Sequence, residues 1–396
     1  MNLSALTSRD FCIYLIGNVF ALNALWMQRL TIGWLAWNLT GSASYVGLVA
    51  FVNFAPTVVA GPFFGVLVDR IRIRRAAMIT QGFLCALALL LFASHAMGVL
   101  GPVLLAVVSG LLGMAMAAHH PIRMSLAPRL VERGDIASVV SLTAINFNLA
   151  RLSGPALGGW MIASFGIGAS LMTQAIFYLP FILALSFLNP RETDPKGDKA
   201  PFLKEMAIGI RHVLGSSLIR SAIVVTGAGA FISRGVLEIL PVIADGVFDR
   251  GATGLGLLTA AAGLGALIAG IAKAAMRTQA PGRLPRLALA SALVGLMLVP
   301  LVGLSQIWVL TLGLISGLGF ATTMTGISMQ TAIQVDLADD MRGRVMSLWV
   351  LVGVGAAATG AVFLGALTDL VGLGIGLGLV GASGVVLLGL FVRRIW

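Results

Sequence analysis

The chain has 396 residues, of which 58% are hydrophobic and only 10% are charged, and its mean hydropathy is +1.00. Soluble domains usually carry about 25% charged residues, so this composition excludes a water-soluble globular protein and predicts one that lies largely in a membrane. The net charge of +11 does not indicate a nucleic-acid partner, because the basic residues lie at the ends of apolar segments and are not interleaved with aromatic residues.

Twelve apolar runs are long enough to cross a bilayer, since about 20 residues span its hydrocarbon core. In chain order they cover residues 11–37, 44–68, 75–95, 101–121, 137–163, 168–188, 216–243, 253–275, 284–303, 307–333, 343–369 and 372–392. The first run is too long for a secretory signal and has no basic segment before it, so we expect a retained span. The sequence therefore predicts an all-α membrane protein with twelve transmembrane helices.

Lysine and arginine residues predict the orientation of these spans. With both termini in the cytoplasm, all but four of the 26 basic residues lie at or near the cytoplasmic side. Arg250 lies outside, and Arg29, Arg151 and Arg234 fall within spans. We therefore expect a multi-pass protein of the cytoplasmic (inner) membrane with both termini in the cytoplasm.

The middle and the two halves of the chain indicate an internal duplication. The only long polar stretch, within residues 189–215, predicts a cytoplasmic linker between an N-terminal six-helix bundle (1–188) and a C-terminal one (216–396). Residues 141–168 and 347–374 share a Ser-Leu pair and four glycines at an offset of 206, and residues 41–48 resemble 250–257 at an offset of 209. Such a repeat is typical of secondary transporters with a site near the bilayer midplane.

The stretch GPFFGVLVDRIRIRR, residues 61–75, combines charge and glycine between two apolar runs. Helix packing accounts for its glycines and membrane topology for its arginines, but neither accounts for Asp69. The stretch resembles the loop signature after the second span of the major facilitator superfamily, with one extra residue before the last basic pair. The resemblance implies that the carboxylate of Asp69 faces the start of the eleventh span, near residues 342–345, and gates the cytoplasmic side. The motif residues are Gly61, Gly65, Asp69, Arg70, Arg74 and Arg75.

A second motif, GPALGG, lies in the fifth span after an arginine. It is similar to the glycine–proline motif of the exporters of that superfamily, and the run from residue 121 to 159 resembles the branch of enterobactin and macrolide exporters called transmembrane secretion effectors. The resemblance implies two pseudo-symmetric six-helix bundles and transport by alternating access. The motif residues are Arg151, Gly154, Pro155, Gly158 and Gly159.

Charged residues inside spans are costly and mark candidate functional sites. Arg234 and Glu238 are i, i+4 neighbours and can pair along one helix. The resemblance places the first and seventh spans on opposite sides of a substrate cavity, which implies a cluster of Arg29, Arg234 and Glu238. Two interpretations stay open: a salt bridge that holds the halves together, or proton coupling at Glu238. The surplus of positive charge favours an anionic substrate.

Polar and aromatic residues of other spans are candidates for the cavity wall. Trp26 and Asn18 share the first span with Arg29, while the amides of the later spans either line a cavity or form hydrogen bonds between helices. The adjacent histidines His119 and His120 have no acidic or cysteine neighbours, which favours a structural role over a metal site, and we expect no metal. The predicted cavity residues are Asn18, Trp26, Asn53, Asn146 and Gln330, and Asn148 and Gln174 share the same two interpretations.

We expect a secondary active transporter, proton-coupled and exporting a small amphipathic or anionic molecule such as a siderophore or a drug. The sequence has no G-x-x-x-x-G-K-[ST] string, so the proton gradient is the expected driving force and no cofactor is expected. It also lacks H-E-x-x-H and G-x-S-x-G strings, which argues against an enzyme. The alternatives are an importer of a small metabolite and a sensor or assembly protein with a transporter fold. The expected partners are the lipid bilayer and the substrate, with the chain as a monomer.

Overall fold

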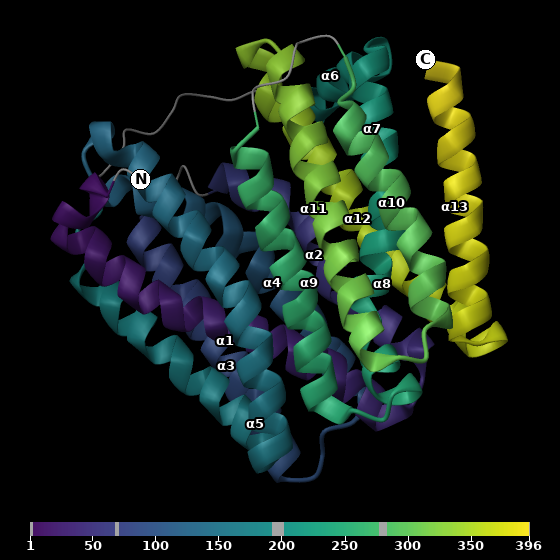
Figure 1. The fold of residues 1–396 in the computed structure, drawn as a ribbon. Helices are drawn as coiled ribbons and strands as arrows, with labels where there is room; N and C mark the ends of the chain where they lie inside the picture. The colour runs from purple at the N-terminus through teal and green to yellow at the C-terminus, as the bar shows by residue number, and fades with distance from the viewer. Residues whose placement is uncertain (1–2, 68–70, 192–201, 277–282, 396) are drawn as a thin grey trace. The chain divides into compact units, whose positions relative to one another are not determined.

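The computed structural model describes residues 3–67, 71–191, 202–276 and 283–395, and every regular element within them is helical (Figure 1). The long helices are α1 (Arg9–Thr40), α2 (Ala43–Leu67), α3 (Ile73–Ala96), α4 (Pro102–Leu126), α5 (Ile136–Phe187), α9 (Gly251–Ala274), α10 (Arg286–Leu304), α11 (Trp308–Asp336), α12 (Asp339–Val371) and α13 (Leu373–Ile395). The shorter helices are η1 (Ser4–Thr7), η3 (Ala127–Leu130), η4 (Arg133–Asp135), α6 (Phe202–Gly215), α7 (Ser217–Gly229), η5 (Ala230–Arg234), α8 (Gly235–Glu238) and η6 (Val242–Val247).

Within the described residues, 11 helical segments are long and apolar enough to cross a membrane. Helix α5 has 52 residues, so it is about 78 Å long and contains two spans of a hydrocarbon core that is about 30 Å thick. It bends at Gly166, where the backbone leaves the helical region with φ 85° and ψ 170°. Counting α5 as two spans gives the twelve that the sequence predicts, and the bend lies between its predicted fifth and sixth spans.

The chain divides into two compact units. The first contains Met1–Leu39, Val52–Lys199 and Gly251–Ala260, and the second contains Thr40–Phe51, Ala200–Arg250 and Ala261–Trp396. The first residues of α9 therefore belong to the first unit, and the first residues of α2 belong to the second. The predicted division into bundles of residues 1–188 and 216–396 stays a prediction.

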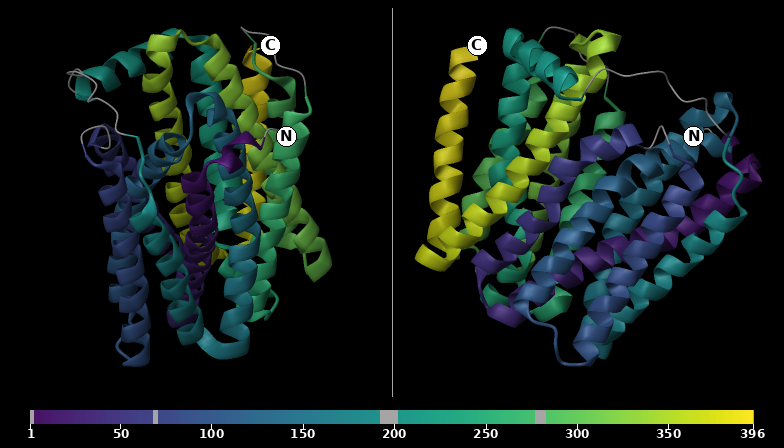
Figure 2. Two further views of the ribbon diagram at one scale, coloured as in Figure 1. Left: turned by 90° about the vertical axis from the view of Figure 1, so that its left-hand side faces the viewer. Right: turned by 180° about the vertical axis from the view of Figure 1, so that it is seen from behind.

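In the first unit, α1 and the second part of α5 lie side by side (Figure 1, Figure 2). Buried hydrogen bonds join them: Tyr178 Oη donates to Gln28 Oε1 at 2.8 Å, and Gln174 Nε2 donates to Thr31 Oγ1 at 2.8 Å. Polar side chains in a membrane protein are commonly satisfied between helices in this way. Of the two roles considered for Gln174, its contacts show the bond between helices.

In the second unit, α13 packs along α10 at one edge of the helices (Figure 2). The two helices approach closely because Gly381 of α13 lies against the ring of Pro300, and Gly303 of α10 lies against Leu377, where a Cβ would be 2.8 Å from the leucine Cβ. Small residues at such crossings let the helix backbones approach, which is how helices without a hydrophobic driving force associate in lipid.

The predicted repeat is visible in the backbone. Gly372 ends α12 with φ 84° and ψ 155°, nearly the conformation of Gly166 in α5, which lies 206 residues earlier. The φ angles of both glycines are positive, a conformation that glycine adopts without strain. The same offset that aligns the sequences therefore aligns the breaks after the fifth and eleventh spans.

The repeat is also visible in helix packing, within each unit separately. In the first unit Gly159 of α5 packs on the backbone of Ala252 in α9, and a Cβ at Gly159 would lie 2.5 Å from the carbonyl oxygen of Ala252. In the second unit Gly365 of α12 packs on the backbone of Ala43 in α2. Gly159 and Gly365 are 206 residues apart, and Ala43 and Ala252 are 209 residues apart. These are the two offsets of the sequence repeat, so the same contact occurs once in each unit.

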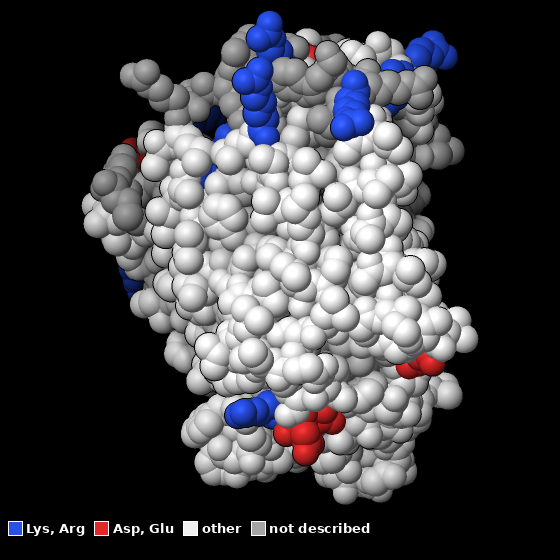
Figure 3. Space-filling model, turned by 45° about the vertical axis from the view of Figure 1, so that its right-hand side comes forward, with Lys and Arg blue, Asp and Glu red and all other residues white. Residues whose placement is uncertain are grey.

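Charged side chains gather at the helix ends on the face drawn in Figure 3. Most Lys and Arg side chains lie at one end of this face, Asp and Glu with further basic atoms lie near the other, and the centre of the face between them shows no charged side chain. An uncharged centre of this kind suits the hydrocarbon core, where each charge is costly. With the candidate spans, it identifies a multi-pass membrane protein.

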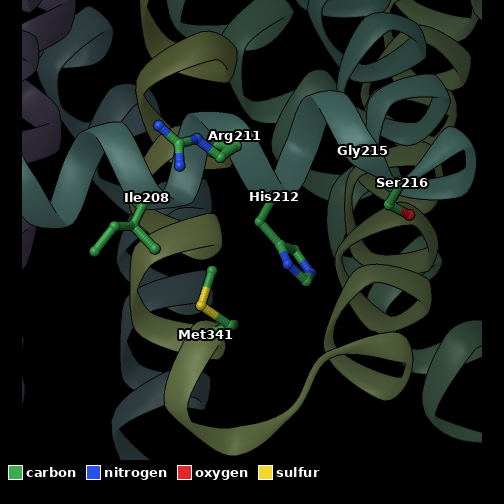
Figure 4. A pocket seen from close by; sticks show the side chains of 6 residues that line it. All are labelled: Ile208, Arg211, His212, Gly215, Ser216 and Met341. Atoms are coloured by element: carbon green, nitrogen blue, oxygen red, sulfur yellow. The ribbon is translucent and has the colours of Figure 1, made fainter.

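Part of the predicted linker is helical, which its polar composition did not indicate. Helix α6 packs on the start of α12, where a Cβ at Gly209 would lie 3.3 Å from the side chains of Arg344 and Leu348. This contact with another part of the chain contributes to the stability of the helix. A hollow between α6 and α12 is lined by Ile208, Arg211, His212, Gly215, Ser216 and Met341 (Figure 4).

Candidate functional site

Three arginine side chains of the first unit lie over aromatic rings of the same unit. The guanidinium carbon of Arg29 lies 5.4 Å from the ring centre of Trp26 and 4.9 Å from that of Phe54, and the guanidinium carbon of Arg151 lies 5.8 Å from Trp26. Cation–π contacts of this length stabilise by about 0.5–2 kcal/mol. They offset part of the roughly 2.5–3.5 kcal/mol that an arginine costs at the centre of a membrane helix. Three residues of the predicted sites, Arg29, Trp26 and Arg151, are thus brought together.

Arg123 extends this group and was not among the predicted site residues. Its guanidinium carbon lies 5.2 Å from the ring centre of Phe147, which itself meets Trp26 edge to face at 5.7 Å. The sequence prediction ended the fourth span at Pro121, whereas α4 continues past it. Proline inside a membrane helix is tolerated, so an apolar run that resumes after Pro121 was the missed signal. We call the whole group the arginine–aromatic cluster: Arg29, Arg123, Arg151, Trp26, Phe54 and Phe147.

Polar side chains of the first unit divide into those with and those without a hydrogen-bond partner among the described residues. Asn53 Nδ2 donates to the carbonyl of Ser109 at 3.1 Å, which ties α2 to α4. Asn18 is fully buried, and among the described residues neither atom of its amide has a hydrogen-bond partner; the same holds for Asn146 Nδ2 and Trp26 Nε1. Leaving such a group unsatisfied costs about 1–3 kcal/mol. Their role in a substrate cavity stays a prediction.

The seventh span of the second unit is irregular. It runs through α7, η5, α8 and η6, of which η5 and η6 are π-helical. Arg234 ends η5 and is exposed, whereas Glu238 ends α8 and is half-buried. Short π-helical turns are frequent at functional sites. Arg29 belongs to the first unit, so its predicted cluster with Arg234 and Glu238 stays a prediction, as does the cavity role of half-buried Gln330.

The glycine motif of α5 is a packing surface. A Cβ at Gly154 would lie 2.6 Å from the Cβ of Trp26, and one at Gly158 would lie 3.4 Å from the side chain of Leu30. Gly159 faces α9 instead, and Gly256 of α9 in turn approaches the carbonyl of Pro155. The motif therefore lets α5 contact both α1 and the start of α9 at backbone distance.

The loop motif is described only in part. Arg74 Nη1 donates to the carbonyl of Leu188 at 2.8 Å, which ties the start of α3 to the end of α5, and Arg75 is exposed. No described atom lies within 4 Å of the position that a Cβ of Gly61 would take, so the packing role considered for this glycine is not seen. Gly65 lies within α2, while Asp69 and Arg70 lie outside the described residues.

A carboxylate that the sequence analysis missed caps the start of α2. Asp369 Oδ2 accepts hydrogen bonds from Ser42 Oγ and from the backbone N–H of Ser44, both at 2.8 Å, and Oδ1 accepts one from the N–H of Ala43 at 2.9 Å. The first N–H groups of a helix lack partners within it and carry partial positive charge, so this carboxylate satisfies and attracts them. The residue that corresponds to Asp369 in the first half of the repeat is Ala163, which is not acidic. The repeat therefore did not indicate a functional carboxylate at this position.

The paired histidines have separate environments. His119 is buried, and its Nδ1 lies 3.3 Å from Gln81 Nε2, which ties α4 to α3, whereas His120 is exposed. In the described part of the chain no group of three histidine, cysteine or acidic residues is placed to hold a metal ion. The structural role considered for His119 agrees with its contact.

The family described as transmembrane secretion effector matches residues 1–395. The enterobactin exporter EntS of Shigella boydii serotype 18 is 28% identical over 338 residues, which are 83% of this chain and 75% of the relative, and that of Escherichia coli matches equally. A solved bacterial homologue of the human lysosomal transporter Spinster has a TM-score of 0.73 at 14% identity and covers 96% of this chain and 95% of its own. A mutant of the nucleoside transporter NupG has a TM-score of 0.75 at 10% identity, and the match covers 97% of this chain and 99% of the NupG chain. The chain belongs to the transmembrane secretion effector family of the major facilitator superfamily.

Proposed function

We propose that the chain is a proton-driven exporter that moves a small anionic molecule out of the cell by alternating access. Its family makes it a membrane transporter rather than an enzyme. The observation that carries the anionic substrate is the arginine–aromatic cluster of the first unit, in which the guanidinium groups of Arg29 and Arg151 both lie over the ring of Trp26.

The physical argument starts from the dielectric of the site. Opposite charges attract several times more strongly in a low-dielectric interior than in water, and like charges repel to the same degree. Guanidinium groups near Trp26 and Phe147 therefore favour an anion and oppose a cation. The aromatic rings beside the arginines make the surroundings partly apolar, which suits the uncharged part of the same molecule. An amphipathic anion satisfies both properties, whereas a cationic drug satisfies only the second.

Export by alternating access needs contacts that can close each side of the membrane in turn. In the proposed cycle, the contacts of α2 with α12 and of α9 with α5 close the outer side. They are built from small residues, such as Gly365 on Ala43 and Gly159 on Ala252, which lets helices separate without unpacking large side chains. The predicted contact of Asp69 closes the inner side.

The direction, the driving force and the location are further parts of the proposal. The relatives named as enterobactin exporters support export, and they make a siderophore one substrate to test. Glu238 is the proposed proton-coupling group, since a half-buried carboxylate in a transmembrane helix can exchange a proton between states. The basic residues at the helix ends support a cytoplasmic membrane location with both termini inside and a monomer of two six-helix bundles.

Transport by purified protein in liposomes tests this proposal. An imposed pH gradient is combined with a fluorescent pH indicator inside the vesicles and with salicylate, 2,3-dihydroxybenzoate, enterobactin or the cation ethidium outside. We expect proton movement that depends on an anion and is absent from protein-free vesicles. Proton movement with ethidium alone, or none with any of the four compounds, would contradict the proposal.

A further inference from the structure

A partly open cavity of about 230 Å³ lies in the second unit, lined by residues of α7, η5, α10, α11 and α12. Clefts and cavities with a few convergent polar groups are where proteins bind small molecules, so this cavity is a candidate binding site. All its walls come from one unit. The residues of the arginine–aromatic cluster are not among those that line it.

Glycines keep the cavity open. Gly229, Gly326 and Gly353 lie in three of the helices that line it, and no described atom lies within 4 Å of the position that a Cβ of any of them would take. Elsewhere in this chain glycines serve close helix contacts, as at Gly265, where a Cβ would clash with the backbone of Ser316. Glycine in a helix costs about 1 kcal/mol relative to alanine, and here no close packing offsets that cost.

Hydroxyl groups and an indole give the cavity a polar wall. Thr226 Oγ1 donates to the carbonyl of Ala222 at 2.8 Å and accepts a hydrogen bond from Trp349 Nε1 at 3.3 Å, which fixes the indole ring against the cavity. Ser233 is only 2% exposed, and among the described residues its Oγ has no hydrogen-bond partner. A buried hydroxyl without a partner is costly, so a ligand that accepts a hydrogen bond from Ser233 gains by satisfying it.

Arg234 supplies the charge. It follows Ser233 in the π-helical turn η5 and lines the same cavity. A guanidinium offers several N–H donors in one plane, which suits a carboxylate or phenolate oxygen. The fixed indole of Trp349 offers a flat apolar face to a ring. The volume lies below the roughly 300–1,000 Å³ of sites that bury drug-sized ligands, so it suits a single substituted ring.

We propose that this cavity binds an aromatic acid, that is, one ring bearing a carboxylate or phenolate, as part of the exported molecule. Arg234 pairs with the acid oxygen, Ser233 donates a hydrogen bond to it, and Trp349 packs on the ring. The inference rests on the proposed function, of which it names the substrate class and a site in the second unit.

Equilibrium binding of radiolabelled salicylate to the full chain in lipid nanodiscs tests the site without any gradient. We expect binding that unlabelled benzoate displaces and neutral benzyl alcohol does not. Gly353→Leu and Gly326→Leu place a side chain in the cavity and should abolish binding. The matched control is Gly313→Leu, which adds the same side chain at an exposed position of α11 with no described atom within 4 Å.

The charge is tested separately from the volume. Arg234→Gln should weaken salicylate binding about tenfold or more, the order expected when a charge-assisted hydrogen bond is lost, and Arg234→Lys should weaken it less. Ser233→Ala serves as a second variant of the wall if a leucine variant fails to fold. Absence of salicylate binding to the wild type overturns the inference. Wild-type affinity in Gly353→Leu overturns it too, as does wild-type affinity in both Ser233→Ala and Arg234→Gln.

Failure of this inference and failure of the proposed function give different results. If the chain binds salicylate in the cavity but moves no anion in liposomes, the proposed export function is contradicted and the proposed binding site is retained. A chain that exports anions equally well after Gly353→Leu keeps the exporter and overturns the site.

Discussion

Asp369 at the end of α12 accepts a hydrogen bond from Ser42 at the start of α2, 327 residues earlier in the chain. The same carboxylate accepts the backbone N–H groups of Ala43 and Ser44, so it acts as a helix cap supplied by another helix. From the family resemblance we expect Asp69, after the second predicted span, to face the start of the eleventh span near residues 342–345. The two helices would then be reciprocal, each ending in a carboxylate that caps the start of the other.

Replacing Asp369 by asparagine should weaken the contact between α2 and α12. The amide keeps the shape but loses the charge, and caps of this kind contribute about 0.5–2 kcal/mol. After replacement of the native cysteines, a cysteine at Val362, beside Gly47 in this contact, should react faster with a membrane-impermeant maleimide. Asp336→Asn, which removes an exposed acidic residue at the end of α11, is the control. Equal reaction rates in the Asp369 variant and the wild type would rule out the cap as a closing contact.

Gly159→Val should disrupt the contact between α5 and α9. Its Cβ would lie 2.5 Å from the carbonyl oxygen of Ala252, and overpacking of this kind costs about 1–3 kcal/mol. We expect a lower midpoint of thermal unfolding in detergent and loss of transport. Gly313→Val, at an exposed position without close atoms, should change the midpoint little. Similar midpoints for the two variants would mean that the glycine contact does not limit stability.

Properties encoded locally were predictable from the sequence, and contacts between distant segments were not. Hydropathy over about 20 residues depends on neighbouring residues alone, which is why the spans and the break near Gly166 agree with the structure. The cap at Asp369 depends on a residue more than 300 positions away, and a carboxylate at a helix end has no local pattern that names its partner. Arg123 was missed because Pro121 was treated as a helix end, although neighbouring helices let the helix continue.

Arg29 should matter for transport through both its charge and its planar shape. Arg29→Gln removes the charge from the arginine–aromatic cluster and should lower the uptake of salicylate into inverted vesicles about tenfold or more, equivalent to about 1.4 kcal/mol. Arg29→Lys keeps the charge but stacks less well on Trp26 and Phe54, so we expect an intermediate rate.

The control for this prediction is Arg250→Gln. Arg250 makes a contact of the same kind, 5.4 Å from the ring centre of Trp308, but the sequence places it outside the spans. Its loss should leave salicylate uptake unchanged. Equal losses of uptake in the Arg29→Gln and Arg250→Gln variants would show that the effect comes from general destabilisation.

Glu238→Gln should separate proton coupling from substrate movement. If Glu238 carries the proton, the variant keeps exchange of labelled for unlabelled salicylate across the membrane but loses stimulation of uptake by a pH gradient. Asp245→Asn is the control, because Asp245 lies in η6, later in the same span. Uptake by this variant should still be stimulated by the pH gradient. A Glu238→Gln variant whose uptake still follows the pH gradient would favour the other interpretation, a structural ion pair.

The expected gating role of Asp69, together with the cap at Asp369, makes a prediction about a double variant. If the two carboxylates close opposite sides, Asp69→Asn favours the state open to the cytoplasm and Asp369→Asn favours the state open to the outside. Each change removes a contact made in only one state, so it shifts the equilibrium by the free energy of that contact. The double variant should therefore return towards the wild-type distribution, measured as maleimide reaction rates of cysteines introduced near each end of α2. Its transport should stay impaired even so, because neither closed state is then held. Shifts of the two single variants in the same direction would exclude the reciprocal arrangement, since two carboxylates on the same side cannot compensate each other.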